Sequence, residues 1–421
     1  MIKIGIVGVG TVGCSVANIL QRNKDIISAR AGVEIIPEIG VVRSLDKKRD
    51  VNIKLTTNVD EVLENSEIDI VVELMGGVEE PYKIVKKALA NNKSVVTANK
   101  ALLAYHRYEL QEIAGNLPLF YEASVAGGIP IIGALRNGLS ANHIESIVGI
   151  LNGTCNYMLT KMINEGVSYD DVLKEAQELG YAEADPTFDV GGYDAAHKLL
   201  ILASIAYGID AKPEDILIEG IENITQSDVE FAKEFGYELK LLGIAKKNGD
   251  GVELRVHPTM VKKTHPISKV DGVMNAVSVV GDAVGQTMFY GPGAGGDATA
   301  SAVIADIIEI ARGNTGPMLG YKKGLERGLK LLDASQIETR YYLKLKVIDK
   351  PGVLAAVTSV LSDCNISISS VLQKESRVQN RVRLLLTTHK CKESDIKEAI
   401  AKLQKLDCVG GENVSMIRIE E

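Results

Sequence analysis

Two hydrophobic patterns alternate over the first 130 residues of the chain. Short runs that are apolar along most of their length have the size of strands, and segments with helical spacing, such as residues 79–92, stand between them. The strand-like runs are residues 2–7, 34–42, 68–76, 94–99 and 117–123. Strands that are apolar throughout are buried on both faces, and their alternation with helices is typical of a doubly wound parallel sheet. The sequence therefore predicts an α/β fold class.

A glycine-rich turn lies directly between the first strand-like run and the first helical one. Gly8, Gly10 and Gly13 have the spacing G-x-G-x-x-G, and the amphipathic run 14–22 follows. In dinucleotide-binding folds the first glycine permits the tight turn, the second lets the backbone approach the pyrophosphate, and the third lets helix pack on strand. The phosphates then face the helix N-terminus. We interpret residues 1–130 as a Rossmann-type dinucleotide-binding domain, with a merely structural turn as the alternative.

The residue that follows the second strand-like run bears on the choice of cofactor. An acidic residue near that point would accept a hydrogen bond from the ribose 2′-hydroxyl of NAD, but this chain has Arg43. A guanidinium group can pair with a 2′-phosphate. Arg43 therefore favours NADP, with NAD possible if this arginine only lies on the surface.

The pattern changes near residue 131. Strand-like segments now follow one another as in antiparallel sheets, interleaved with helices, which predicts an α+β substrate and dimerisation domain over residues 131–296. They are residues 143–151, 238–247, 252–261, 275–281 and 287–291. A glycine-rich loop then enters a long amphipathic helix, so residues 297–315 are expected to complete the nucleotide domain. Gly293 and Gly295 in this loop are placed for close approach to cofactor or sheet.

Four acids and a single lysine mark the segment from residue 181 to residue 198. They are Glu183, Asp185, Asp189, Asp194 and Lys198. Such a segment could be a metal site, a solvated loop or a pocket for a polar substrate. Its second half has the apolar spacing of a helix, on which Asp194 and Lys198 stand four apart on one face and can act on one ligand. Carboxylates without metal-ligand spacing suit an ammonium group better than a metal.

The composition argues against several classes of function. The net charge is −8 and acids and bases are interspersed, so nothing indicates a nucleic-acid surface or a polybasic membrane anchor. The chain begins without a charged leader and no apolar run approaches the ~20 residues that span a bilayer, so a cytoplasmic protein is expected. Five scattered cysteines without a C-x-x-C pair fit reduced thiols. Small metabolites are the expected partners.

Several motifs in this order resemble those of homoserine dehydrogenases, from Met1 to about Arg312. They are the opening strand and glycine turn, "TANKALLA" (97–104), "YEASVAGGIPII" (121–132) and "GILNGTCNYML" (149–159). The resemblance implies an oxidoreductase that interconverts L-homoserine and L-aspartate 4-semialdehyde with a nicotinamide cofactor. It places the chain in the biosynthesis of threonine, methionine and isoleucine.

The resemblance also implies roles for individual residues. The family's equivalents of Glu183 and Asp194 hold the amino group of the substrate, and Lys198 matches the family's proposed proton donor. Lys100 follows a strand-like run, at the sheet edge where ligands bind in such folds, and is the second candidate for acid–base catalysis and a cofactor contact. A solvated loop lysine is the alternative for Lys100. Either lysine can serve only if burial or another cation lowers its pKa.

Other residues are expected in supporting parts. Asp185 and Asp189 support the substrate pocket, and Asp189 is the better candidate for orienting its neighbours. Further cofactor contacts are expected at Thr11, Val12 and Gly180.

The segment from residue 121 matches the family's monovalent-cation loop. The resemblance implies that the Glu122 carboxylate and three backbone carbonyls surround a structural sodium ion (Na+). The carbonyls are those of Val125, Gly127 and Ile129. Oxygen ligands suit such an ion, and paired glycines let carbonyls turn inward. A glycine-rich hinge without metal is the alternative.

The last eighty or so residues have the order β-α-β-β-α-β, which predicts a ferredoxin-like fold. Residues 316–340 are polar and glycine-bearing and are expected to be a linker, and residues 341–421 resemble an ACT domain. This amino-acid-sensing module is appended to many bacterial homoserine dehydrogenases, so threonine is the first effector to test. The candidate effector residues are Asp349, Gly352, Val353, Leu354 and Asn365. A purely dimerising role is the alternative.

The sequence thus predicts a homoserine dehydrogenase, regulated through its C-terminal segment and assembled as a homodimer or homotetramer. One rival is a related Rossmann dehydrogenase that acts on another amino or hydroxy acid. The other is a catalytically silent amino-acid sensor. A silent sensor is expected to have lost site residues, yet both lysines and both substrate-binding acids are present.

Overall fold

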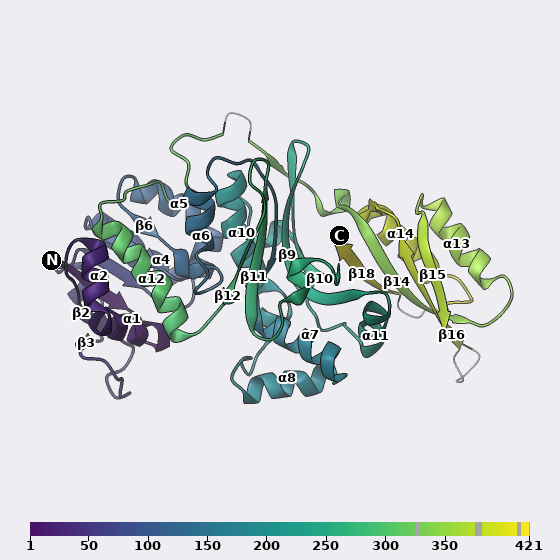
Figure 1. Cartoon of the computed structure of the whole chain (residues 1–421), viewed down its shortest axis with the longest axis horizontal. Coiled ribbons are helices and arrows are strands. Elements are labelled where there is room, and N and C mark those ends of the chain that lie inside the picture. The colour runs from purple at the N-terminus through teal and green to yellow at the C-terminus, as the bar shows by residue number, and fades with distance from the viewer. Residues whose placement is uncertain (326–327, 375–380, 411–413, 421) are drawn as a thin grey trace.

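The computed structural model describes residues 1–325, 328–374, 381–410 and 414–420, and its parts lie in a row (Figure 1). A parallel sheet with its helices lies at the amino-terminal end, a mostly antiparallel sheet occupies the middle, and the C-terminal strands and helices lie at the other end. Within the described ranges, no helix has both the length and the apolar character needed to cross a membrane.

The first sheet has six parallel strands in the order β3-β2-β1-β4-β5-β6. The strands are β1 Ile2–Val7, β2 Ile35–Val41, β3 Lys54–Thr56, β4 Ile70–Glu73, β5 Ser94–Thr97 and β6 Leu119–Phe120. The helices between them are α1 Thr11–Arg22, α2 Lys24–Ala31, α3 Asp60–Leu63, α4 Glu79–Ala90 and α5 Lys100–Ala114. The predicted doubly wound sheet is confirmed. Its strand order reverses between β1 and β4, which opens a crevice at the carboxyl ends of these strands.

The last strand of this sheet is shorter than the sequence predicts. Residues 117–123 read as a strand, but only Leu119 and Phe120 pair with β5. Residues Glu122–Ser124 form a 3₁₀ turn instead. The backbone N–H of Glu122 donates to the carboxylate of Asp306 at 2.7 Å, so a side chain from elsewhere draws the backbone out of the sheet.

Helix α12, Gly296–Ala311, lies beside α1 and α2 although it comes far later in the chain (Figure 1). Its buried residues Val303 and Ile307 belong to the same apolar cluster as Ile4 of β1 and Val16 of α1. A downstream helix therefore completes the core of the first sheet.

The second sheet runs through the middle and C-terminal parts in the order β12-β11-β7-β9-β10-β18-β14-β16-β15. Its middle strands are β7 Ile144–Ile150, β8 Leu217–Ile218, β9 Tyr237–Asn248, β10 Gly251–Lys262, β11 Met274–Gly281 and β12 Gly285–Pro292. The helices of this part are α6 Ile131–Gly133, α7 Gly153–Glu165, α8 Tyr169–Glu178, α9 Thr187–Val190, α10 Tyr193–Tyr207 and α11 Gln226–Glu234. Helix α10 is buried along almost its whole length, because it packs against α5 on one side and against β9 and β10 on the other.

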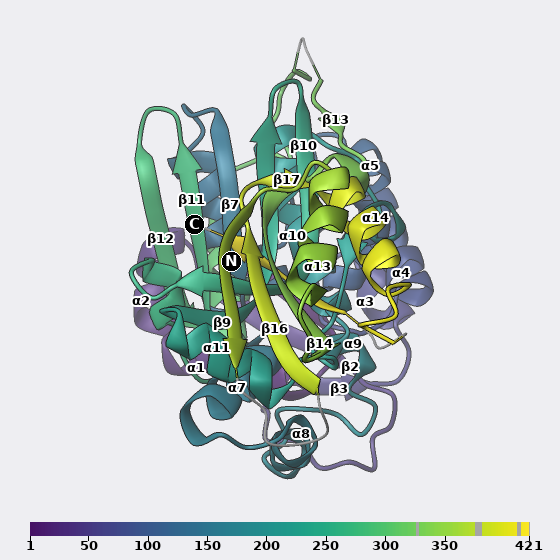
Figure 2. The same ribbon diagram turned by 90° about the vertical axis from the view of Figure 1, so that its right-hand side faces the viewer.

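The C-terminal elements confirm the predicted β-α-β-β-α-β order. They are β14 Glu338–Ile348, α13 Val353–Asp363, β15 Ile368–Lys374, β16 Arg381–Thr388, β17 Cys391–Lys392, α14 Glu393–Leu403 and β18 Ser415–Glu420, with the two-residue β17 as an addition. Helices α13 and α14 lie side by side on one face of these strands (Figure 2). The ends of two predicted strands, residue 375 and residues 412–413, lie outside the described residues.

The last strand joins the middle and C-terminal parts into one sheet. β18 pairs antiparallel with β14 and parallel with β10, where Arg418 lies opposite Thr259. A short strand, β13 Lys330–Leu331, also pairs with β10. The stretch expected to be a linker, residues 316–340, thus contributes to the central sheet. The C-terminal part is an extension of that sheet and is not joined to it by a free connection alone.

Candidate active site

The glycine turn after β1 forms one end of a groove at the carboxyl edge of the first sheet. Gly8 has a φ of +105°, and a side chain there would lie 2.8 Å from the backbone oxygen of Leu74. A side chain at Gly13 would lie 2.5 Å from the oxygen of Gly8, so both positions need glycine for packing. Around Gly10, by contrast, no described atom lies within 4 Å of an added Cβ. Of these three glycines, Gly10, which is expected to face a ligand, is the one with open space beside it.

The start of α1 also fits an anion. Gly10 is the N-cap of this helix, and no side chain caps it in the described structure, so the first backbone N–H groups remain available near Thr11 and Val12. The groove beside them has a volume of about 570 Å³ and runs between Gly10, Arg43 and Met75. These features fit the phosphates of a nicotinamide dinucleotide.

The groove also contains two cations that the sequence interpretation missed. Lys47 and Arg49 line it together with Arg43. Arg49 donates to the backbone oxygens of Val9 at 2.9 Å, Ser44 at 3.0 Å and Lys47 at 2.8 Å, and so holds the loop after β2 against the glycine turn. The sequence offered only a cluster of basic residues, because the fold of this loop decides which of them face the groove.

A second cavity of about 270 Å³ adjoins the groove and brings the two predicted lysines together. The two cavities share Leu74 and Met75 in the loop after β4. Lys100, at the start of α5, and Lys198, in the first half of α10, both line the smaller one. Its other walls come from the turns around residues 123–127 and 293–299, and from Val12 of α1. The cavity thus lies where the first sheet meets the middle part of the chain.

Asp194 binds both lysines. The Nζ of Lys198 lies 2.7 Å from Oδ2 of Asp194, and the Nζ of Lys100 lies 2.8 Å from Oδ1. Lys198 also donates to the backbone oxygen of Leu151 at 2.7 Å. Each oxygen of this buried carboxylate therefore faces the ammonium group of one lysine.

Asn152 holds this carboxylate in place. It caps α7, where its Oδ1 accepts a hydrogen bond from the N–H of Cys155 at 2.8 Å. Its Nδ2 donates to Asp194 at 2.9 Å and to Asp189 at 2.7 Å. Asp189 thus lies beside the site and acts through Asn152. The sequence interpretation missed Asn152, although an asparagine before a helical run is a recognisable cap signal.

Burial and charge move the pKa values of the three groups in different directions. Burial raises the pKa of Asp194, but the charges of Lys198 and Lys100 together outweigh it and keep this carboxylate ionised. Burial lowers the pKa of Lys198; Asp194 opposes this in part, and Lys100 lowers it further. For Lys100, burial lowers the pKa but the nearby acids together raise it above its ordinary value. Lys198 is therefore the lysine that more readily releases a proton.

Glu183 and Asp185 are both exposed and do not take part in the ion pairs around Asp194. Glu183 is exposed, and its backbone oxygen accepts a hydrogen bond from the side chain of Gln177 at 3.0 Å. Its charge still helps to raise the pKa of Lys100. Asp185 accepts hydrogen bonds from the hydroxyl and the backbone N–H of Thr187, at 2.6 and 3.1 Å, and so fixes the start of α9.

The segment predicted to hold sodium forms one wall of the smaller cavity. Glu122 is buried, and its two carboxylate oxygens accept hydrogen bonds from the N–H groups of Ile132 at 2.8 Å and Gly133 at 2.7 Å. Val125 and Ile129 are buried, and Gly127 has a φ of +54°. Burial raises the pKa of Glu122, which a neighbouring cation would oppose.

The remaining predicted cofactor glycines are placed differently. Gly293 lines the smaller cavity. Gly295 is the N-cap of α12 with a φ of +113°, and Gly180 follows α8 with a φ of +74°. Neither Gly295 nor Gly180 is among the residues that line the two cavities.

The candidate effector residues lie in the C-terminal part, on the turn before α13 and on the turn after it. Gly352 is the N-cap of α13 with a φ of +90°, and Asn365 has a φ of +57°. Asp349 accepts a hydrogen bond from Gln373 at 3.4 Å, and Leu354 is 44% exposed. Val353 begins α13 and is partly buried.

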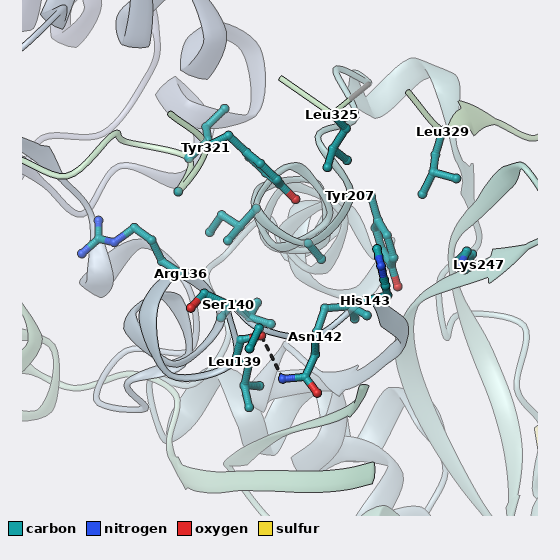
Figure 3. Close-up of a pocket in the computed structure, with 17 residues that line it drawn as sticks. Arg136, Leu139, Ser140, Asn142, His143, Tyr207, Lys247, Tyr321, Leu325 and Leu329 are labelled. Carbon is teal, nitrogen blue, oxygen red and sulfur yellow. Dashed lines mark hydrogen bonds between the residues drawn. The ribbon is translucent and has the colours of Figure 1, made fainter. Parts of the chain in front are cut away.

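A third cavity of about 420 Å³ lies at the other end of α10 (Figure 3). Its walls include Tyr207, at the end of that helix, and Tyr321. Its basic side chains are those of Arg136, His143 and Lys247, and none of the predicted catalytic, substrate or cofactor residues belongs to it. This cavity therefore carries no part of the candidate active site.

Comparisons with known proteins match the whole chain. Residues 130–308 match the family described as "Homoserine dehydrogenase", residues 8–117 match "Homoserine dehydrogenase, NAD binding domain", and residues 341–408 match "ACT domain". The chain is 55% identical over 419 residues to a homoserine dehydrogenase of Helicobacter pylori, which covers 100% of this chain and 99% of that protein. It is 46% identical to the homoserine dehydrogenase of Pseudomonas aeruginosa, again over 100% of this chain and 99% of the relative.

Solved structures give the same picture. The crystal structure of a homoserine dehydrogenase from Thiobacillus denitrificans superimposes with a TM-score of 0.95 at 47% identity and covers 100% of this chain and 98% of that one. A hyperthermophilic archaeal homoserine dehydrogenase in complex with NADPH superimposes with a TM-score of 0.62 at 31% identity, over 73% of this chain and 97% of that one.

Proposed function

This chain belongs to the homoserine dehydrogenase family, and we propose that it interconverts L-homoserine and L-aspartate 4-semialdehyde in the cavity between α5 and α10, with Lys198 as the group that moves the proton. As a homoserine dehydrogenase it is an oxidoreductase that acts on a CH–OH group. The observation that carries the proposal is the bridge that Asp194 makes between Lys100 and Lys198, next to the nucleotide groove.

Lys198 is the proposed acid–base group for a reason of charge and burial. Oxidation of the alcohol requires a base to take the hydroxyl proton, and reduction of the aldehyde requires an acid to return it. Burial and the nearby Lys100 lower the pKa of Lys198, which brings its neutral form closer to the working pH. Lys100 stays an ammonium group and stabilises negative charge on the substrate oxygen. The nicotinamide ring, when bound, exchanges a hydride with the carbon that carries this oxygen.

The substrate's own ammonium group needs a separate partner. The carboxylate of Asp194 lies between the two lysines, and the exposed carboxylate of Glu183 is near enough to raise the pKa of Lys100. We assign the substrate ammonium to these two acids. Asn152 and Asp189 keep Asp194 oriented while the substrate binds. The two rival interpretations, a silent sensor and a dehydrogenase of another hydroxy acid, are not favoured, because the family is shown over the full length.

For the cofactor we propose NADP. The domain that matches the family's NAD-binding domain contains the groove, and three cations line it, namely Arg43, Lys47 and Arg49. A 2′-phosphate carries two negative charges at most, which this group of cations can pair with. The complex of an archaeal relative with NADPH supports the same choice.

We further propose a sodium ion beside Glu122, with the carbonyls of Val125, Gly127 and Ile129 as its other ligands. Its part would be structural, since it would brace the segment that connects the first sheet to α6. The C-terminal part is the proposed regulatory site for an amino acid, with threonine as the first candidate. For the assembly we propose a homodimer or a homotetramer.

The test of the proposed function is a direct assay. Purified protein with L-homoserine and NADP+ should produce NADPH absorbance, and the reverse reaction should consume NADPH with L-aspartate 4-semialdehyde. L-serine, L-threonine and 2-hydroxy acids serve as comparison substrates. Turnover of one of these at a higher kcat/KM than L-homoserine would contradict the proposal.

A further inference from the structure

One buried carboxyl group at the carboxyl edge of the first sheet has no part in the reaction as described above. Glu73 is the last residue of β4 and is 0% exposed. It lies beneath two loops that build the active site, the loop after β4 with Met75 and the loop after β5 that leads to Lys100. A buried ionisable group at this edge of the sheet requires a physical reason, because burial of a charge is costly.

Its hydrogen bonds connect these two loops. Oε1 of Glu73 accepts the backbone N–H of Met75 at 2.7 Å, and Oε2 accepts the hydroxyl of Thr97 at 2.6 Å. The two oxygens thus hold the ends of the adjacent strands β4 and β5.

The hydroxyl of Thr97 continues the chain of hydrogen bonds to α5. Thr97 Oγ1 accepts the N–H of Asn99 at 3.0 Å. Asn99 is the N-cap of α5, where its Oδ1 accepts the N–H of Leu102 at 3.0 Å, and its Nδ2 donates to the backbone oxygen of Gly77 at 2.9 Å. Lys100 is the first residue of this helix. Glu73 is therefore connected through Thr97 and Asn99 to the start of the helix that carries Lys100.

We infer that Glu73 is a positioning residue of this dehydrogenase, which acts through Thr97 and Asn99 to hold Lys100 in place over the site. The inference rests on the proposed part of Lys100 in the reaction. It goes beyond that proposal because it assigns a function to a group that lies outside the ion cluster and is itself not among the residues that line the two cavities. The groups that face Glu73 through hydrogen bonds are all neutral, namely Thr97, Asn99 and the N–H of Met75. Burial raises its pKa to about 7, so its charge, and with it this hydrogen-bond network, can change near neutral pH.

The variant that isolates this function is Glu73→Gln. Glutamine keeps the shape and one acceptor oxygen for Met75, but it presents an N–H donor where Thr97 now donates its hydroxyl. The expected result is a 10- to 100-fold lower kcat with less than a threefold change in NADPH affinity, measured by NADPH fluorescence. Thr97→Val should reproduce the loss and Thr97→Ser, which keeps the hydroxyl, should restore near-normal kcat. Glu253→Gln, at a buried glutamate of β10 away from both cavities, is the matched control and should leave kcat unchanged.

A double-mutant cycle distinguishes positioning from a general structural effect. If Glu73 acts through Lys100, Glu73→Gln should cost little further kcat in a Lys100→Ala background, and the pH dependence of kcat near neutrality should differ between wild type and Glu73→Gln. Fully additive losses, or identical pH profiles, would overturn this inference alone. Normal turnover of the single variant Lys100→Ala would overturn both the assignment of Lys100 and the inference built on it. Melting temperatures of all variants show whether each one is folded.

Discussion

Arg418, on the last strand of the chain, donates two hydrogen bonds to the carboxylate of Glu219, at 2.7 and 2.8 Å, although 199 positions separate them. Arg418 is 1% exposed and also bonds to the buried Glu393 of α14. Glu219 belongs to the segment between β8 and α11, and its N–H donates to Val256 of β10 at 2.8 Å. A buried guanidinium group therefore ties the C-terminal part to the middle of the molecule.

The same segment contacts the active site on its other side. The N–H of Ile221 donates to the backbone oxygen of Val190 at 2.9 Å, and Val190 ends α9, which carries Asp189. Asp189 shares Asn152 with Asp194. A path of direct contacts thus leads from Arg418 to the ion cluster. Spatial continuity alone does not prove energetic coupling, so it requires a test.

We expect Glu219→Gln to weaken regulation without loss of basal activity. The substitution removes the charge that Arg418 pairs with, while the backbone contacts of this segment remain. The concentration of L-threonine for half-maximal inhibition should rise several-fold, which corresponds to a loss of about 1 kcal/mol of coupling. Glu222→Gln, at an exposed glutamate in the same segment, is the control. An unchanged inhibition curve in Glu219→Gln would show that the ion pair between Arg418 and Glu219 has no part in regulation.

We expect deletion of residues 334–421 to destabilise the rest of the protein. The deletion would remove β18 and leave residues 259–261 of β10 without their strand partner, although β8 and β13 stay paired with other parts of β10. Arg255, 1% exposed, would lose the Glu420 carboxylate at 3.2 Å and keep the carboxylate of Glu253 at 3.7 Å. Unpaired strand edges favour aggregation, and loss of one partner of a buried ion pair is costly. Size-exclusion chromatography and thermal melting of the shortened chain check this. A monodisperse product with the melting temperature of the full chain would show that the central sheet is stable by itself.

We expect Lys198→Ala to lower kcat by roughly 10²- to 10⁴-fold, the usual range for loss of a positioned acid–base group. Affinity for NADPH should change little, because Lys198 lies in the smaller cavity and not in the nucleotide groove. In wild type, homoserine oxidation should rise with pH, because the neutral form of Lys198 is the base, and its lowered pKa brings this rise below the range of an ordinary lysine. Stopped-flow measurement of single turnovers isolates the chemical step. Near-normal turnover of the variant would show that Lys198 is not the acid–base group and would assign that role to Lys100.

The substitution Arg43→Ala should weaken the binding of NADPH much more than the binding of NADH. A charged hydrogen bond to phosphate contributes about 1.5–3 kcal/mol, which predicts roughly a 10- to 100-fold loss for NADPH. Lys47→Ala should show the same selectivity to a smaller degree. Arg49→Ala should weaken both cofactors, because Arg49 holds the loop to the backbone of Val9. Dissociation constants from fluorescence titration decide the question, and equal losses for both cofactors in Arg43→Ala would show that Arg43 does not contact the 2′-phosphate.

The ionisation of the buried Glu73 should make the free energy of unfolding depend on pH. Its pKa is raised from 4.5 to about 7 in the folded state, chiefly by burial, so the folded state holds this proton more tightly than the unfolded chain. The resulting stabilisation is complete below about pH 4.5 and is lost as the pH rises through about 7, and it amounts to roughly 3 kcal/mol. Glu73→Gln should therefore gain stability relative to wild type between pH 5 and pH 8. Chemical unfolding of both proteins at pH 5 and pH 8 measures their free energies of unfolding. If the difference between the two proteins were the same at both pH values, the raised pKa of Glu73 would be contradicted.

The sequence by itself determined the features that depend on neighbours along the chain. Apolar runs between helical segments specified the parallel sheet, because strands buried on both faces need apolar residues at every position. The glycine turn could also be predicted from the sequence, because Gly8 and Gly13 are required by contacts within the turn and the adjoining strands. The pair Asp194 and Lys198 followed from helical spacing alone, because residues four apart share one face.

Only the tertiary structure decided which distant groups meet. Lys100 reaches Asp194 because α5 packs against α10, and Asn152 joins them because α7 begins beside α9; spacing along the chain specifies neither contact. Glu183 is exposed, and its charge acts on Lys100 across the fold. The raised pKa of Glu73 comes from its burial under two loops. The pairing of β18 with β10 could not be predicted either, because strands pair through backbone hydrogen bonds, which leave little trace in the pattern of side chains. Local periodicity thus specifies elements and their faces, whereas packing between elements determines the chemistry of the site.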